Sequence, residues 1–166
     1  MAATGPRKQL ALDTNVLLNL ANGEDFAHSF REGFQKAGYA LRFSPAVLAE
    51  LIAAELEGDK REQELAQVAL GSVVRWKIRP FDLTSVEEGM AEQLGRRLLR
   101  SGLLPPEEIN DELILAEVPV AAVPLLVTSD KHLLDIDEDA LVLLFNSADL
   151  PPVHPVHPKR LLRALG

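Results

Sequence analysis

Four acidic residues stand at positions where a carboxylate could take part in chemistry. Asp13 and Asp130 each follow a short apolar run typical of a buried strand. Glu50 and Asp111 each lie in a predicted helix that is entered from a loop. In a parallel α/β sheet, the ends of the strands and the starts of the following helices gather at one edge. We therefore expect these four carboxylates, which are distant in sequence, to converge.

Carboxylates that share one cleft repel one another and raise each other's pKa unless a cation compensates them. Mg²⁺ and Mn²⁺ prefer oxygen ligands, and the chain has no cysteine that could supply a thiolate. Two such ions held by acids can cut a phosphodiester, because one activates water and the other stabilises the leaving oxygen. The residue types therefore indicate a hydrolytic metal site.

Each acid also has a purely structural interpretation. Asp13 and Asp130 could cap the helices that follow them. Glu50 is a good helix former, although it interrupts an otherwise apolar stretch. Asp111 competes with its neighbour Glu112, which points about 100° away on a helix. Because all four acids are expected at the same edge of the sheet, the functional interpretation is favoured over these local ones.

The elements that must position the acids alternate between strand and helix. This alternation predicts a three-layer α/β/α fold around a central, mainly parallel sheet. Ser44 and Pro45 are expected to start the helix that carries Glu50, and Gly102 to end another helix. The helix that carries Asp111 is expected to end or kink before Pro119, because proline removes a helical hydrogen bond. Strands are predicted at 10–12, 39–43, 75–81, 125–128 and 141–145, and helices at 14–21, 26–37, 46–56, 60–73, 84–101 and 105–118.

Length and composition predict one globular domain. The chain has 166 residues, of which 47% are hydrophobic and 25% charged. We expect the domain to cover residues 1–150, and residues 151–166 to form a proline-rich basic tail or docking arm. No apolar run approaches the roughly 20 residues of a membrane span. The start of the chain is a poor signal peptide, so a cytoplasmic protein is expected.

The charge balance sets a condition on any nucleic-acid partner. With 17 basic and 25 acidic side chains, the net charge is −8. Strong non-specific binding to nucleic acid usually requires a basic surface, so a local basic patch or bound metal ions would be needed. Arg75, Lys77 and Arg79 alternate along the predicted strand at 75–81 and are a candidate RNA-backbone contact. A charged edge that prevents sheet-to-sheet pairing explains them equally well.

The acids and their neighbours resemble the PIN domain family. The order and separations of the motifs fit that family from Leu10 to Phe145. The resemblance implies that four acids surround Mg²⁺ or Mn²⁺ and that neighbouring polar residues orient the acids or bound water. The motifs are Asp13-Thr14-Asn15 after a strand, Glu50 early in a helix, Asn110-Asp111, and Thr128-Ser129-Asp130 after a late strand. The implied acids are Asp13, Glu50, Asp111 and Asp130, and the implied supporting residues are Asn15, Thr128 and Ser129.

The resemblance also implies a function and partners. PIN-like proteins of this kind are metal-dependent endoribonucleases, and many are the toxin of a toxin–antitoxin pair. The expected reaction is hydrolysis of single-stranded RNA to 5′-phosphate and 3′-hydroxyl ends. The expected partners are the RNA, an antitoxin that inserts near the acidic cleft, and a second copy of the chain. Two features depart from the compact family pattern. Pro119 interrupts the helix after Asp111, and the segment 58–100 is longer than in compact members, which points toward a housekeeping or orphan subgroup.

Two other functions remain open at this point. A haloacid-dehalogenase-like phosphatase also begins with a strand followed by Asp, but it needs a second Asp where this chain has Asn15. A catalytically silent PIN-like module that binds RNA or a protein would not need to retain four acids. Both therefore rank below the nuclease.

Overall fold

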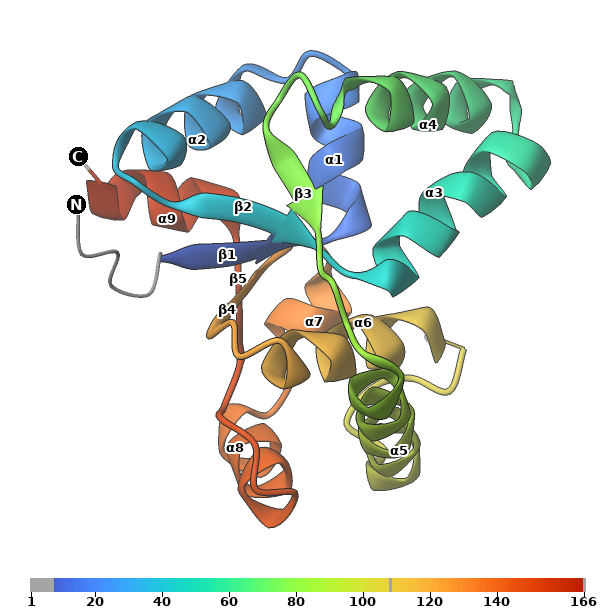
Figure 1. Ribbon diagram of the computed structural model, residues 1–166, viewed down its shortest axis with the longest axis vertical. Helices are drawn as coiled ribbons and strands as arrows, with labels where there is room; N and C mark the ends of the chain where they lie inside the picture. Colours follow the sequence, from blue (N-terminus) through green and yellow to red (C-terminus); the bar gives the residue numbers. More distant parts are fainter. Residues whose placement is uncertain (1–7, 108, 166) are drawn as a thin grey trace.

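A five-stranded parallel sheet lies at the centre of the computed structural model, which describes residues 8–107 and 109–165 (Figure 1). The strand order is β3-β2-β1-β4-β5, and every neighbouring pair is parallel. The first three strands thus proceed outward on one side of β1, and the last two proceed outward on the other side. The strands are β1 (Gln9–Leu12), β2 (Ala40–Phe43), β3 (Ile78–Pro80), β4 (Leu125–Val127) and β5 (His154–Val156).

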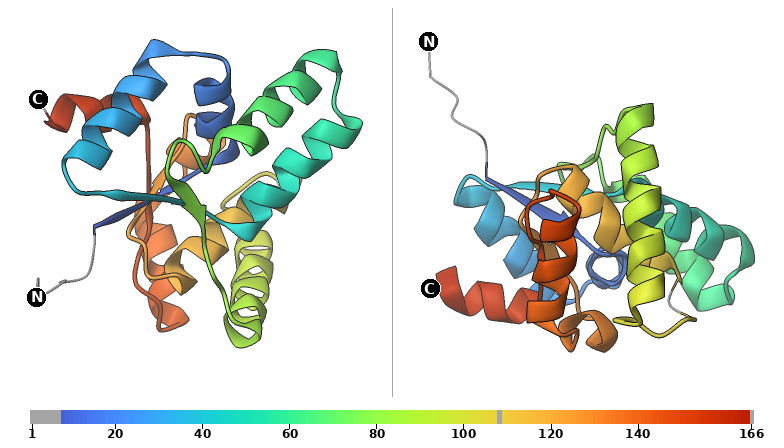
Figure 2. Two further views of the ribbon diagram at one scale, coloured as in Figure 1. Left: turned by 45° about the horizontal axis from the view of Figure 1, so that its top comes forward. Right: turned by 90° about the horizontal axis from the view of Figure 1, so that it is seen from below.

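Helices cover both faces of this sheet, which confirms the predicted three-layer α/β/α fold. Helices α1, α2 and α9 lie on one side and α5, α6 and α8 on the other (Figure 1), and Figure 2 shows the same layers from two further directions. Helices α3 and α4 pack against each other as a pair. The described helices are α1 (Thr14–Ala21), α2 (Asp25–Lys36), α3 (Pro45–Glu57), α4 (Lys60–Ser72), α5 (Ser85–Ser101), α6 (Ile109–Val120), α7 (Lys131–Leu134), α8 (Glu138–Ser147) and α9 (Pro158–Leu165).

The central strand β1 is apolar because both of its faces are covered. Leu10, Ala11 and Leu12 are each about 1% exposed. A continuous apolar run of this kind is typical of a parallel strand between two helical layers. In the sheet, Leu10 lies beside Leu41 of β2 and Leu12 beside Val127 of β4. The buried apolar run ends with Leu12, and the next residue is the buried carboxylate of Asp13.

Local signals start and end the helices as the sequence predicts. Ser44 caps α3, with its hydroxyl oxygen accepting a hydrogen bond from the Val47 backbone N–H at 3.3 Å, and Pro45 is the first helical residue. Gly102 ends α5 in the left-handed conformation with φ 72°. This conformation suits glycine because it has no Cβ. Helix α6 runs through Pro119 to Val120, so the helix ends two residues later than predicted.

Two strand predictions need correction. Residues 141–145 are helical and belong to α8, so the predicted strand there is wrong. The Asp137 side chain caps this helix by accepting from the Ala140 backbone N–H at 3.1 Å, and Leu141 and Phe145 lie one turn apart and are both buried. The predicted strand 75–81 is reduced to β3, because residues 73–77 form turns. Arg75, Lys77 and Arg79 therefore do not alternate along one strand.

The segment predicted as a tail is built into the fold. Strand β5 pairs with β4, and the Thr128 backbone N–H donates to the Val156 carbonyl at 2.9 Å. Helix α9 packs on α2, where the Lys159 ammonium lies 4.9 Å from the centroid of the Phe26 ring. Within the described part of the chain, 151–165 is thus not a free arm. None of the helices described is long and apolar enough to cross a membrane.

We predict that Val153→Ala destabilises the protein by about 2 kcal/mol, because Val153 is fully buried and its replacement leaves a cavity. Val86→Ala is the matched control, since Val86 is 74% exposed on α5, and its effect is expected to stay within about 0.5 kcal/mol. Urea unfolding monitored by circular dichroism measures both. Equal stability of the two variants would show that the segment after residue 150 adds nothing to the core.

Candidate active site

Asp13 occupies the point where the order of the sheet reverses. It directly follows β1, and its backbone N–H donates to the Val127 carbonyl of β4 at 2.9 Å. From β1 the chain builds β2 and β3 on one side, and later β4 and β5 on the other. In open parallel sheets, ligands bind at the carboxyl ends of the strands at such a reversal. Asp13 is nevertheless only 2% exposed, so its carboxylate depends on protein partners.

Three donors hold the Asp13 carboxylate. Its Oδ2 atom accepts from the Thr128 hydroxyl at 2.7 Å and from the Asn15 side-chain amide at 3.0 Å. Its Oδ1 atom accepts from the Thr14 backbone N–H at 2.8 Å. Thr128 follows β4 and Asn15 lies in the first turn of α1, so the carboxylate joins two neighbouring strand ends. Of the three supporting residues implied by the sequence, Asn15 and Thr128 therefore touch this acid directly.

The same polar cluster extends to the second acid. The Asn15 side-chain oxygen accepts from the Ser129 backbone N–H at 2.9 Å, and the Thr128 hydroxyl oxygen accepts from the Asp130 backbone N–H at 3.0 Å. Ser129 thus contributes its main chain to the cluster. The Thr128 hydroxyl and the Asn15 amide each donate to Asp13 and also accept from a backbone N–H in the segment after β4. These additional bonds fix both side chains and so fix the orientation of the Asp13 carboxylate.

The charge on Asp13 is poorly compensated. Burial raises its pKa, the hydrogen bonds from Thr128, Thr14 and Asn15 lower it, and the negative charge of Asp130 raises it again. The balance is an elevated pKa, with hydrogen bonds rather than ion pairs as the stabilising influences. Asp130 is half-buried and also caps α7, with Oδ1 accepting from the His132 backbone N–H at 2.9 Å. Asp130 therefore both caps α7 and places a negative charge near Asp13.

Glu50 joins this edge of the sheet through α1. Its carboxylate accepts a hydrogen bond from the hydroxyl of Thr14, the residue that follows Asp13. Ser44 and Pro45 set where α3 begins, and Glu50 comes in the second turn and is half-buried. Glu50 is thus linked to Asp13 through one intervening residue, Thr14, whose backbone N–H donates to Asp13 and whose hydroxyl donates to Glu50.

Asp111 lies on α6, which packs against α3 and β4. It is 7% exposed, and its neighbour Glu112 is 2% exposed. Burial raises the pKa of Glu112, and its Oε1 atom has no hydrogen-bond partner among the described residues. Both candidates from the sequence are therefore buried acids on one helix, and burial alone does not choose between them.

Glu117 is a buried acid that the sequence interpretation missed. Its Oε1 atom accepts from the Ala46 backbone N–H at 2.9 Å at the start of α3, beside the Ser44 cap. Burial raises its pKa and the bond from Ala46 lowers it. This contact fixes α6, which carries Asp111, against the start of α3, which carries Glu50. A lone acid in the apolar run 113–120 was the available signal, since the same argument identified Glu50.

The predicted RNA-contact residues lie elsewhere. Arg75 is in the turn before β3, with its guanidinium donating to the Ser72 hydroxyl at 3.3 Å. Lys77 directly precedes β3 and Arg79 lies within it. All three therefore stand at or near the amino end of a parallel strand, whereas Asp13 and Thr128 follow carboxyl ends. The structure does not bring them together with the acids.

The acidic edge fits a hard divalent cation by its chemistry. The donors are carboxylate oxygens, and the elevated pKa of Asp13 beside Asp130 marks a place where added positive charge is stabilising. With the side chains as placed in residues 8–107 and 109–165, no group of three or more acids or histidines is close enough together to hold a metal ion. A metal site that uses all four acids therefore requires side-chain adjustment.

Comparison with known proteins gives a consistent family and fold. A model of the PIN domain matches residues 10–139. VapBC2 from Rickettsia felis, solved bound to a DNA fragment from its promoter, contains a chain that is 21% identical, with a TM-score of 0.60 over 90% of this chain and 98% of that one. VapBC from Salmonella typhimurium, solved bound to DNA, gives 19% identity and a TM-score of 0.55 over 91% and 98%.

VapBC-1 from nontypeable Haemophilus influenzae is a third similar structure, 15% identical with a TM-score of 0.56 over 91% of this chain and 98% of that one. At these identities the structural matches establish the fold alone. No curated protein sequence matches the chain.

We predict that Thr128→Val costs about 1–3 kcal/mol at pH 7, because it leaves the buried Asp13 carboxylate without its shortest hydrogen bond. The hydroxyl favours the charged form and lowers the pKa of Asp13. Its loss therefore matters most above that pKa and shrinks as the pH falls and Asp13 becomes protonated. Denaturant unfolding at pH 7 and at acidic pH measures the difference.

Two matched variants control this experiment. Thr128→Ser retains the hydroxyl and should keep most of the stability. Ser129→Ala retains the backbone N–H that donates to Asn15, and its effect should stay within about 0.5 kcal/mol. A Thr128→Val penalty that does not change with pH would contradict the role assigned to the hydroxyl.

Proposed function

The chain belongs to the PIN domain family, whose members are generally nucleases, and from this premise we propose that it is a metal-dependent endoribonuclease. The proposed reaction is hydrolysis of single-stranded RNA to 5′-phosphate and 3′-hydroxyl ends. The observation that carries the proposal is the Asp13 carboxylate, held by Thr128 and Asn15 next to Asp130 where the sheet order reverses. This position and this excess of negative charge suit a cation-assisted reaction.

The proposed ligands of Mg²⁺ or Mn²⁺ are Asp13, Glu50, Asp111 and Asp130. When bound, such ions activate water and neutralise charge on the phosphate. Thr128 and Asn15 act as positioning residues, because they hold one oxygen of Asp13 and so aim the carboxylate. The elevated pKa of Asp13 makes a proton compete for this carboxylate, so metal affinity should fall as the pH falls.

Asn15 argues against the phosphatase alternative. Its amide nitrogen donates to Asp13 and its amide oxygen accepts from Ser129, so both ends of the side chain serve to orient the first acid. An aspartate at this position would place a second negative charge against Asp13 and could not donate. Phosphatase chemistry requires an acid at this position, whereas Asn15 orients Asp13 by hydrogen bonding.

We further propose a protein partner of the antitoxin kind and a homodimer acting in the cytoplasm. The similar structures support the partner, because VapBC, and FitAB as a further structure of the same fold, are toxin–antitoxin complexes that were solved bound to DNA. The family resemblance supports insertion of a partner segment near the acidic edge. A toxin role for this chain rests on the same support.

The proposal predicts RNA cleavage with Mn²⁺ or Mg²⁺ that stops in EDTA. Asp13→Asn and Asp130→Asn should each reduce the rate by at least about a hundredfold, since each removes a proposed metal ligand. Asp82→Asn, at an exposed loop position, is the charge-matched control and should cleave normally. End-labelled RNA analysed on denaturing gels measures the rate and identifies the 5′-phosphate ends.

Metal binding is measured separately by calorimetry and by thermal melting with Mn²⁺. Binding without cleavage of any RNA would favour a catalytically silent module. If Mn²⁺ neither bound nor stabilised the wild-type protein, the four-acid site would be wrong.

A paired experiment assigns the acid on α6. We predict that Asp111→Asn abolishes cleavage and Mn²⁺ stabilisation, whereas Glu112→Gln retains both. Glu112→Gln should also stabilise the metal-free protein at pH 7. Burial raises the pKa of Glu112, so its charged form is penalised above that pKa, and the gain should vanish below the pKa of the unfolded chain. The opposite pattern would make Glu112 the ligand.

A further inference from the structure

A basic groove lies at the edge of the sheet opposite the acids. It has a volume of about 760 Å³ and is lined by the starts of β1 and β2, the region of β3 and the end of α2. Its charged lining residues are Lys36, Arg42, Lys77 and Arg79, and none of the described residues that line it is acidic. In a chain with 25 acidic and 17 basic side chains, such a concentration of cations needs an explanation.

Two of these cations are placed against each other by the sheet itself. Arg42 of β2 and Arg79 of β3 are register partners on neighbouring parallel strands. Like charges that lie directly opposite in a sheet destabilise it. The Arg42 guanidinium is also held in place, donating to the Pro80 carbonyl at 2.9 Å and to the Gln9 side-chain oxygen at 3.3 Å. An anion in the groove would convert this repulsion into attraction.

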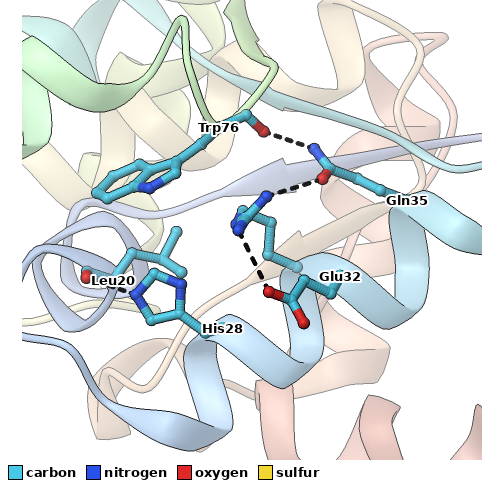
Figure 3. Close-up of polar contacts among 6 residues, drawn as sticks. Leu20, His28, Glu32, Gln35 and Trp76 are labelled. Carbon is cyan, nitrogen blue, oxygen red and sulfur yellow. Dashed lines mark hydrogen bonds and ion pairs between the residues drawn. The ribbon is translucent and has the colours of Figure 1, made fainter.

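A third cation is positioned by a strained turn. Lys77 has φ 59°, a left-handed conformation that residues other than glycine rarely adopt. The Gln35 side-chain amide holds this turn by donating to the Trp76 carbonyl at 2.7 Å, as Figure 3 shows. It also donates to the Lys77 carbonyl at 3.4 Å. Arg31 donates in turn to the Gln35 oxygen at 3.2 Å. Because surrounding contacts fix the backbone, the position of Lys77 is determined by the fold.

The turn is anchored further by an aromatic contact. Trp76 is 5% exposed, and the His28 ring meets it edge-on with the ring centroids 6.0 Å apart. His28 is itself fixed by a 2.9 Å contact between its Nε2 atom and the Leu20 carbonyl, as Figure 3 shows. The wall of the groove that carries Lys77 is therefore rigidly attached to α1 and α2.

An aromatic ring lies among the cations. Tyr39 lines the groove, the Phe34 ring packs edge-on against it at 5.1 Å, and the Lys8 ammonium lies 5.5 Å from its centroid. Grooves that combine cations with an aromatic platform suit single-stranded nucleic acid, whose phosphates pair with the cations and whose bases stack. The carboxylate side chains of an acidic peptide have no aromatic face that could stack on this ring.

We propose that this groove binds the sugar–phosphate backbone of a single RNA strand. The inference rests on the proposed nuclease function and adds a substrate-binding surface away from the cleavage site. Strand β1 connects the two regions, because Gln9 lines the groove and Asp13 follows the other end of the strand. Four strand steps separate them by only ~13 Å, so one RNA molecule can contact both edges.

RNA binding is tested in EDTA, where no cleavage interferes, by fluorescence anisotropy of a labelled oligouridylate of roughly 12 nucleotides. The variant combines Lys36→Gln, Lys77→Asn and Arg79→Gln. Asparagine is chosen at Lys77 because it tolerates the left-handed conformation. Kd should rise at least about tenfold, and the slope of log Kd against log salt should fall by about 2, since single strands contribute about 0.7 per phosphate contact.

The control carries the same change in net charge on exposed residues away from the groove, Lys60→Gln, Arg96→Gln and Arg100→Gln. Its Kd should stay within about twofold of the wild type. Circular dichroism melting verifies that both variants fold. Equal losses in both variants, or no RNA binding by the wild type, would overturn the proposal. A labelled polyglutamate that binds as tightly as RNA, with the same loss in the groove variant, would instead identify an acidic-peptide site.

The outcomes separate this inference from the nuclease proposal. RNA binding that depends on the groove, in a protein that cleaves no RNA with any metal, would support the groove and reject the nuclease. Cleavage with unchanged affinity in the groove variant would support the nuclease and reject the groove.

Discussion

The burial of one carboxylate at the junction of β1 and β4 is the constraint on which the candidate site depends. Asp13 is almost inaccessible to solvent, and its charge is stabilised by Thr128 and Asn15 rather than by a cation of the protein. A buried charge held only by hydrogen bonds is costly for folding. In the proposed role of Asp13 as a metal ligand this cost has a use, because the same uncompensated charge that weakens the free protein would strengthen cation binding.

The arrangement of the other acids depends on how two helices pack. Glu50 is carried by α3 and Asp111 by α6, and Glu117 links these helices through the Ala46 backbone N–H. The start of a helix carries a partial positive charge, so an acid placed there stabilises the contact. Glu117 therefore has a structural role: by joining α6 to the start of α3, it sets how the helices that carry Asp111 and Glu50 lie against each other.

Opposite charges gather at the two ends of a short sheet. The proposed metal ligands Asp13 and Asp130 follow the carboxyl ends of β1 and β4, whereas Arg42, Arg79 and Lys77 line a groove at the other edge. The net charge of −8 conceals this division. An acidic protein can thus present a local surface suited to a polyanion, because screening limits the reach of exposed charges to about 8–10 Å.

The sequence alone determined the features that depend on local patterns. The apolar run ending at Asp13 identified a buried strand, Ser44-Pro45 and Gly102 marked helix ends, and the order of the acids indicated the family, which the match to residues 10–139 confirms. Tertiary structure alone decided which distant groups meet. Leu141 and Phe145 lie on one face of a helix rather than in a strand, and the expected tail forms β5 and α9. Glu117 bonds to the start of α3, and the basic residues lie at the edge of the sheet away from the acids. The physical reason is that periodicity and caps report how a segment satisfies its own backbone and its burial, whereas hydrogen bonds and charge contacts across the sheet depend on strand order and helix packing.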